Sequence, residues 1–257
     1  MSMSVLSNIS IACLALFGCL GIRSDTPAHP FSRMDSLPRF TLWAWERRED
    51  LRSLNTQKFA IAYLDQTLTI DLSVHSQPRR DLVAFSAAAI RMPVIRVEAT
   101  RFAVLDNENR AEAVRAILSS AREPGIAALQ IDFDATRSQR QFYRALLFDL
   151  RHQMPSNLPL SITALASWCS WDGWLHDLPI DEAVPMLFRM EPDRRRASPE
   201  AQANIDDFRI RESLCQTSVG ISTTEAWPSD LAAKRIYIFP DRGWQRDSPA
   251  NLIRRLP

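Results

Sequence analysis

Eight short apolar runs, rich in β-branched and aromatic residues, recur along the chain, and polar loops or helical segments separate them. Strand-like runs that alternate with helical segments are typical of parallel sheets. Eight such runs predict a closed (β/α)₈ barrel, with an open parallel α/β sheet as the alternative. The runs are FTLWAWE (40–46), FAIAYLD (59–65), PVIRVEA (93–99), AALQIDFD (127–134), LPLSITAL (158–165), AVPMLFRM (183–190), SVGISTT (218–224) and RIYIFPD (235–241).

Helical periodicity is clearest in two connecting segments, residues 109–122 and 138–153. In the second, Phe142, Leu146 and Leu150 recur at a spacing of four and form one apolar face. The other connections are degenerate, so we expect an irregular barrel with short or missing helices. Residues 68–81 suggest an inserted loop or hairpin, residues 168–178 a single helical turn, and residues 249–255 a short last helix.

The first 27 residues are expected to form an export leader. Their apolar run, residues 9–22, is shorter than the roughly 20 residues that span a bilayer, and this length fits a secretory signal. Cys19 ends the sequence LFGC, which resembles a bacterial lipobox, so lipidation of Cys19 is the first expectation. Cleavage near Ala28 and an uncleaved anchor are the alternatives. Residues 28–37 would form a tether and residues 38–257 a single periplasmic barrel domain, with a lipid anchor as its only membrane attachment.

The mature chain would keep two cysteines, Cys169 and Cys215. Cys169 follows one predicted strand and Cys215 precedes another, which places them at opposite ends of a barrel. A disulfide tolerates a Cα separation of up to about 7 Å. We therefore expect two free, buried thiols.

Composition excludes several classes of function. The net charge is +1 and arginines alternate with acids along the chain, so no basic face for nucleic acid is expected. Six glycines without a GxGxxG or Walker pattern give no nucleotide cofactor site. The four histidines are scattered, which supports neither a zinc site nor a Ser-His-Asp triad. No cofactor or metal is expected, although hard oxygen ligands for Mg²⁺ or Ca²⁺ are a minor alternative. The sequence does not define an oligomeric state.

Strand parity places acidic side chains inside the predicted barrel. Alternate residues of a barrel strand face the interior. In the fourth run the odd positions are apolar and suit the helical layer, so Gln130, Asp132 and Asp134 point inward, with Asp134 nearest the carboxyl-terminal rim where barrel enzymes place their chemistry. The same sorting turns these other polar or aromatic side chains inward: Tyr63, Asp65, Arg96, Glu98, Arg189, Glu191, Tyr237 and Asp241.

These inward charges have a structural and a functional interpretation. Arg96 or Arg189 could neutralise Asp132 inside the barrel, which would be internal ion pairing without function. For Asp132 the two interpretations are balanced. For Asp134 and Glu98, nearer the rim, function is favoured, because neighbouring strands lie about 4.8 Å apart and could bring the two carboxyls to the separation used in glycoside hydrolysis.

Tryptophans gather after the predicted strand ends and favour a carbohydrate ligand, since sugar rings dock their C–H faces on flat aromatic rings. Trp43, Trp45 and Trp168 are the candidate sugar platform, and Glu46 follows them as a polar contact. Plugging of the barrel mouth is the alternative explanation for several of the others. These are Trp171, Trp174 and Trp244, while Trp227 follows the seventh run.

The runs FTLWAWERREDL, AIAYLDQTLTI, IRVEAT, LQIDFDATRSQRQFYRALLFDLR, LPLSITALASWC and VPMLFRM together resemble the bacterial exported proteins of domain of unknown function 3142. The resemblance covers nearly all of the mature chain and implies a glycoside-hydrolase-like TIM barrel. Asp132 and Asp134 are also similar to the central part of the chitinase D-x-x-D-x-D-x-E strand. Leu129 replaces its first Asp and Thr136 its catalytic Glu, so the chitinase mechanism does not carry over.

Three hypotheses follow. In the first, the barrel processes a glycan, with Asp134 as general acid/base and Glu98 as its partner; Asp132 and Glu225, near the end of the seventh run, are alternative partners. In the second, it binds a glycan or peptidoglycan without catalysis, as the absence of an acid at Thr136 suggests. In the third, it is an envelope structural protein whose polar interior is ion pairing alone.

Overall fold

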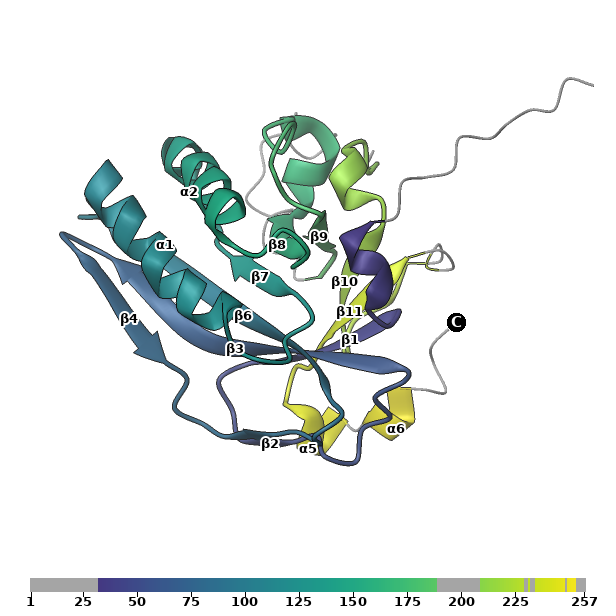
Figure 1. Cartoon of the computed structure of the whole chain (residues 1–257). Coiled ribbons are helices and arrows are strands. Elements are labelled where there is room, and N and C mark those ends of the chain that lie inside the picture. Colours follow the sequence, from purple (N-terminus) through teal and green to yellow (C-terminus); the bar gives the residue numbers. More distant parts are fainter. Residues whose placement is uncertain (1–31, 189–208, 229–230, 232–233, 248, 253–257) are drawn as a thin grey trace, which may run out of the picture. The chain divides into compact units, whose positions relative to one another are not determined.

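The computed structural model describes residues 32–188, 209–228, 231, 234–247 and 249–252. A ring of eight parallel strands forms its centre (Figure 1), in the order β1-β11-β10-β9-β8-β7-β6-β3, and pairing of β3 with β1 closes the ring. The strands are β1 (Phe40–Ala44), β3 (Phe59–Ile70), β6 (Ile90–Ala99), β7 (Leu129–Asp132), β8 (Leu160–Leu165), β9 (Glu182–Met186), β10 (Ser218–Ser222) and β11 (Arg235–Phe239). All eight correspond to the predicted runs. The irregular (β/α)₈ barrel is therefore confirmed, and the open sheet is excluded.

In the described part of the chain, three short strands lie outside this ring. β4 (Val74–Pro78) pairs antiparallel with the end of β3 and forms the predicted hairpin. β2 (Glu49–Asp50) and β5 (Val83–Ala84) form a separate two-stranded sheet. The described helical segments are η1 (Arg33–Ser36), α1 (Asn107–Ala121), η2 (Arg137–Gln139), α2 (Arg140–Gln153), η3 (Trp168–Asp172), η4 (Ser213–Cys215), α5 (Trp244–Asp247) and α6 (Pro249–Leu252).

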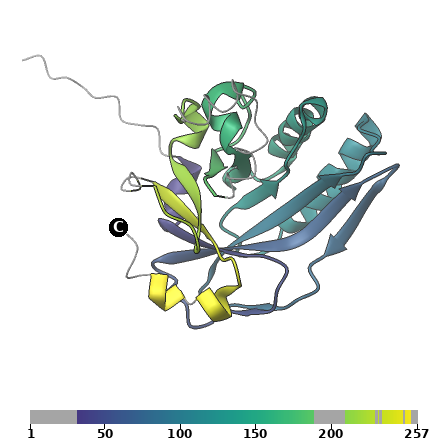
Figure 2. The same cartoon turned by 180° about the vertical axis from the view of Figure 1, so that it is seen from behind.

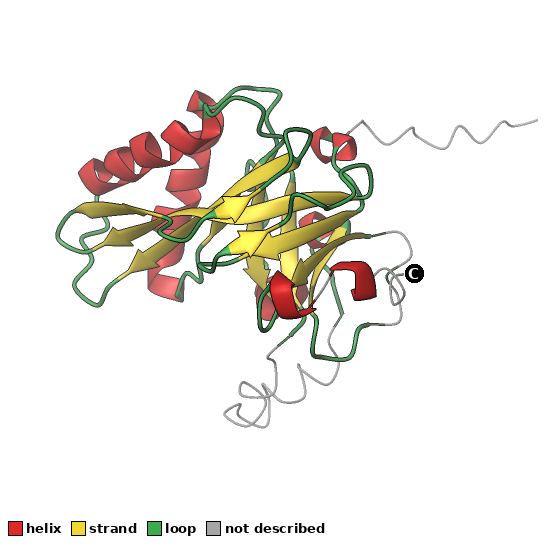
Figure 3. Ribbon diagram, turned by 90° about the horizontal axis from the view of Figure 1, so that it is seen from below, coloured by secondary structure: helices red, strands yellow, loops and turns green. Residues whose placement is uncertain are grey.

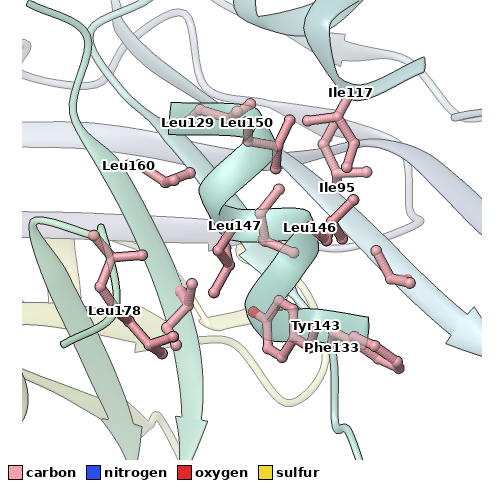
Figure 4. Close-up of a cluster of buried hydrophobic side chains, with 14 of the residues drawn as sticks. Ile95, Ile117, Leu129, Phe133, Tyr143, Leu146, Leu147, Leu150, Leu160 and Leu178 are labelled. Atoms are coloured by element: carbon pink, nitrogen blue, oxygen red, sulfur yellow. The ribbon is translucent and has the colours of Figure 1, made fainter. Parts of the chain in front are cut away.

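The two long helices, α1 and α2, agree with the predicted helical segments and lie side by side on the outside of the ring (Figures 1 and 3). On α2, Leu146, Leu147 and Leu150 are completely buried and point toward strand residues such as Leu129 and Leu160 (Figure 4). Burying a leucine stabilises the fold by about 1.5–3 kcal/mol. This face explains why the periodicity of α2 was visible in the sequence.

A second cluster covers the ring beside β1, β10 and β11. Leu42, Val219 and Ile236 on these strands pack with Trp244 of α5 and Leu252 of α6. These two short helices occupy a different side of the ring from α1 and α2 (Figure 2). The barrel is thus covered by two long helices on one side and by single turns on another.

Small side chains leave room inside the barrel for a few large ones. Ala60, Ala62 and Ala128 face Trp43 and Tyr237 in the interior cluster. Two residues at the start of the described chain, Met34 and Leu37, belong to the same cluster and are buried. From Ser32 onward, the segment expected to be a tether is therefore packed against the barrel.

The inward orientation predicted for Tyr63 and Asp65 is wrong. Tyr63 packs outside the ring against Phe85, with ring centroids 5.1 Å apart. Asp65 accepts a hydrogen bond of 2.5 Å from Ser120 on α1. The apolar Ala60 and Ala62 on the same strand fill the narrow interior instead, and the register of β3 against β6 shifts at Asp65.

The prediction of free thiols is also wrong, because Cys169 and Cys215 form a disulfide with a Cα separation of 5.8 Å. Both are completely buried, as expected. After β8 the chain turns outward into η3, and the carbonyl of Cys169 accepts hydrogen bonds from the backbone N–H groups of Arg211 and Glu212. Both cysteines therefore lie in the outer helical layer rather than at opposite ends of the barrel.

The leader expected at residues 1–27, including Cys19, lies outside the described residues. Within the described part of the chain, no helix is both long and apolar enough to cross a membrane.

Candidate functional site

A cavity of about 350 Å³ lies at the carboxyl-terminal ends of the barrel strands, the end at which barrel enzymes carry their chemistry. The residues that line it come from strand ends on several sides of the ring and from the segments that follow β1 and β11. They are Trp43, Trp45, Arg47, Glu49, Arg96, Asp132, Asp134, Met186, Phe188, Phe239, Pro240, Asp241 and Gly243.

One arginine holds two aspartates at this cavity. Nη1 of Arg96 lies 3.0 Å from a carboxylate oxygen of Asp132 and 3.0 Å from one of Asp134. These two oxygens therefore cannot be further apart than twice that distance. The hydroxyl of Thr163 donates a 2.6 Å hydrogen bond to the other oxygen of Asp132. Asp132 is buried, whereas 43% of the Asp134 side chain is exposed to the cavity mouth.

Charge in this cluster is unbalanced. Arg96 also lies 3.5 Å from Glu98, so this one cation forms ion pairs with three carboxylates. Burial raises the pKa of Asp132 above its ordinary value of 3.8, and Asp134 adds to this, although Arg96 and Thr163 oppose it. Burial alone would lower the pKa of Arg96, but Asp132 and Asp134 outweigh that and raise it. Arg96 thus stays cationic, while Asp132 holds its proton more readily than an exposed aspartate.

Two tryptophans form an aromatic wall of the same cavity. The rings of Trp43 and Trp45 are stacked, with centroids 5.1 Å apart and planes inclined by 12°. Trp43 is fixed by a 2.8 Å hydrogen bond from its indole N–H to Gln130, and Phe239 packs on it at 4.8 Å. Trp45 is 38% exposed, so the outer face of the stack is open to a ligand.

Deeper in the barrel, a polar network supports the floor of the site. Gln130 donates to Ser161, and Ser161 donates to Glu182, which is completely buried. Tyr237 donates a hydrogen bond to Glu182, and Arg235 pairs with it at 2.9 Å. The inward orientation predicted for Tyr237 is confirmed, but Tyr237 lies in this network and does not line the cavity.

Several other predicted site residues lie outside the cavity lining. Glu98 is exposed beside Arg96, and Glu46 accepts a hydrogen bond from the backbone N–H of Arg80. Trp168 is buried in the outer helical layer against Trp174, so it cannot join Trp43 and Trp45 in one sugar platform. The remaining predicted residues that do not line the cavity are Tyr63, Asp65 and Glu225, and Arg189 and Glu191 lie outside the described residues.

Seven lining residues were not predicted from the sequence: Arg47, Glu49, Met186, Phe188, Phe239, Pro240 and Gly243. Phe188 could have been found, because it continues the inward parity of Val184 and Met186 on β9. Arg47, Glu49 and Gly243 belong to segments beyond the ring strands, to which strand parity does not apply.

The fold and the cavity define a TIM-like barrel with an acidic and aromatic pocket at the carboxyl ends of its strands. Residues 89–183 match the sequence model of the family described as Domain of unknown function (DUF3142), and the resemblance drawn from the sequence is confirmed over this segment.

Among solved structures, the crystal structure of the Bacillus cereus spore cortex-lytic enzyme SleL is similar to this chain. The TM-score is 0.45 and the sequence identity 15%, over 72% of this chain and 51% of that one. This chain therefore spans about half the length of the SleL structure. No curated protein matches the chain. Within the described residues, no group of three or more His, Cys, Asp or Glu side chains is arranged to hold a metal ion.

Proposed function

We propose that this barrel binds a glycan in its carboxyl-terminal cavity and hydrolyses it by carboxylate acid/base chemistry. The observation that supports this most directly is that the Trp43–Trp45 stack and the Asp132–Asp134 pair line one cavity. Stacked indoles suit the apolar face of a sugar ring, and carboxylates suit its hydroxyls and glycosidic oxygen. The cavity volume of about 350 Å³ falls in the range of small-ligand pockets.

Asp134 is the carboxylate that would contact the substrate, because its side chain is open to the cavity mouth. Asp132 is buried and would act through Arg96, which binds both carboxylates and fixes where Asp134 points. Glu98 touches the same arginine from outside the lining, so Asp132 replaces Glu98 as the residue proposed to cooperate with Asp134.

Replacing Asp134 by asparagine should lower kcat on the hydrolysed glycan by about 10²- to 10⁴-fold, the range expected when a general acid or base is lost.

Replacing Trp45 by alanine should instead weaken binding by about 3- to 10-fold, the equivalent of one aromatic contact. Reducing-end release and calorimetric binding across a panel of oligosaccharides measure both effects.

The control for this experiment is Asp149→Asn, which removes a charge from an exposed pair with Arg110 on the outer helices. It should change neither parameter. Full activity of Asp134→Asn, with the wild type active, would contradict the assignment of Asp134.

A second candidate function, glycan binding without hydrolysis, is favoured by Thr136. This residue stands where chitinases carry their catalytic Glu. It directly precedes η2, and its backbone N–H donates to the side chain of Gln139, the last residue of that helix. Saturable binding by a wild-type protein that releases no reducing ends from any glycan of the panel would support this second function.

The expected site of action is outside the cytoplasm. Disulfides persist in oxidising compartments and are rare in the cytosol, and Cys169–Cys215 is completely buried. This supports the export proposed from the leader at residues 1–27, and lipidation at Cys19 is part of that proposal.

A further inference from the structure

Glu49 is a buried carboxylate at the cavity that the roles above leave unused. It lies on β2, outside the ring, yet it lines the same cavity as Asp132 and Asp134. Only 3% of the residue is exposed. Asp132 and Asp134 are both bound by Arg96, whereas no arginine among the described residues forms an ion pair with Glu49. A carboxylate buried at a cavity without a paired cation is costly unless it is protonated or used.

The backbone around Glu49 fixes its carboxylate. The N–H of Trp244 lies 3.2 and 3.1 Å from its two oxygens. Gly243 has φ +86°, and a Cβ there would come within 2.7 Å of the Glu49 carboxylate, so the close approach requires glycine. The indole N–H of Trp244 in turn donates to the carbonyl of Trp43, which joins Glu49 to the aromatic wall.

Glu49 and Asp134 approach the cavity from different sides. Glu49 is held by the segment that follows β11, while Asp134 follows β7. In the eight-strand ring β7 and β11 are separated by three strands in either direction, so they stand opposite each other. A substrate in the cavity would therefore lie between the two carboxyl groups. This is the arrangement in which one acid protonates the leaving oxygen and the other activates water.

We propose that Glu49 is the general acid of the hydrolysis proposed above and that Asp134 is the general base. The carboxyl of Glu49 gives its proton to the glycosidic oxygen as the bond from the anomeric carbon to that oxygen breaks. Water attacks the anomeric carbon and gives a proton to Asp134. One water is consumed and two hydroxyl-bearing products leave. Proton exchange with solvent then returns a proton to Glu49 and removes one from Asp134. Burial, the largest influence, raises the pKa of Glu49 and keeps the proton available, against the opposing effect of the Trp244 N–H and of Arg79 and Arg47.

The test is Glu49→Gln, because glutamine keeps a carbonyl oxygen for the Trp244 N–H but has no acidic proton. A general acid matters most when the leaving group is a poor one. On unactivated oligosaccharides of the panel, kcat should fall about 10²- to 10⁴-fold. On 2,4-dinitrophenyl glycosides of the same sugars, whose leaving group needs no proton, kcat should fall less than about 10-fold, and the basic limb of the pH profile should disappear.

Asp106→Asn is the matched control, since Asp106 also accepts a backbone N–H, at the start of α1, on the outside of the barrel. It should leave kcat on both substrates unchanged. Equal losses on both substrates with Glu49→Gln, or a retained basic limb, would assign Glu49 a structural role and overturn the proposal. Absence of turnover by the wild type on every substrate would instead overturn the proposed function, and the role of Glu49 with it.

Discussion

Replacing Arg96 by methionine is expected to lower the free energy of unfolding by about 3–5 kcal/mol at neutral pH, the cost of removing one partner from a buried ion pair. Methionine keeps most of the aliphatic stem, so the loss reports on the charge. Arg96 is 21% exposed and Asp132 only 6%, which leaves the carboxylate of Asp132 buried with Thr163 as its remaining hydrogen-bond donor. Denaturant unfolding with a constant m-value measures the change.

The loss of unfolding free energy caused by Arg96→Met should depend on pH in a defined direction. Without Arg96, burial raises the pKa of Asp132 further above 3.8, so above that pH the unfolded chain has released a proton that the folded protein retains. The folded state then binds more protons, and its stability falls as pH rises. The loss caused by Arg96→Met should therefore be smallest near pH 4 and should grow as the pH rises through the folded-state pKa of Asp132.

Two further variants make this result specific. Arg110→Met removes an arginine of similar exposure, 23%, whose partner Asp149 is 41% exposed, and should cost no more than about 1 kcal/mol. The double variant Arg96→Met with Asp132→Asn removes the unpaired charge and should recover part of the lost stability. Equal losses for Arg96→Met and Arg110→Met at pH 7 would show that the Asp132 pair contributes little.

The ring of strands could be predicted because each run is apolar enough to be buried from both sides. Parity succeeded on β7, where Leu129 and Ile131 are large and apolar and Gln130 and Asp132 are polar, so the two faces differ in the sequence. It failed on β3, where both faces are apolar. There Ala60 and Ala62 face the interior because Trp43 takes the space, a packing constraint that no single strand reveals.

The part of the candidate site formed by Asp132, Asp134 and Arg96 was predicted from the sequence, and the part that lies beyond the ring strands was not. Asp132 and Arg96 lie on strands and Asp134 directly follows β7, so their positions follow from alternation. Glu49 reaches the cavity because β2 pairs with β5 and because Gly243 admits its carboxylate. Both depend on contacts between distant segments, and the contact with Trp244 joins residues 195 positions apart. No local pattern contains that information.

The disulfide was not predicted, for a related reason. The position of Cys169 was inferred from the strand before it, as if the chain continued along the barrel axis. Instead η3 turns into the outer layer, where Trp168 packs against Trp174 and the backbone of Arg211 meets Cys169. The same turn removed Trp168 from the sugar platform. One local change of direction therefore explains both errors.

Reducing this disulfide, or replacing both cysteines by alanine, should lower the free energy of unfolding by about 4 kcal/mol. The bond joins residues 46 positions apart, and in the chain-entropy description closing a loop of that length removes about this much free energy from the unfolded state. Each alanine removes only one buried sulfur atom, so the void that it leaves is small. Chemical denaturation with and without dithiothreitol measures the change, and intact mass reports the gain of two hydrogens on reduction.

Reduced wild type is the matched comparison for Cys169→Ala/Cys215→Ala, since it loses the covalent bond without any change of sequence. The two should unfold at similar denaturant concentrations, and reductant should not destabilise the double variant further. The disulfide closes a segment that includes β9, whose Met186 lines the cavity, so ligand binding should weaken together with stability. Reduced and oxidised wild type that unfold at the same denaturant concentration would contradict a stabilising role, because a constraint of this length must raise the free energy of the unfolded chain.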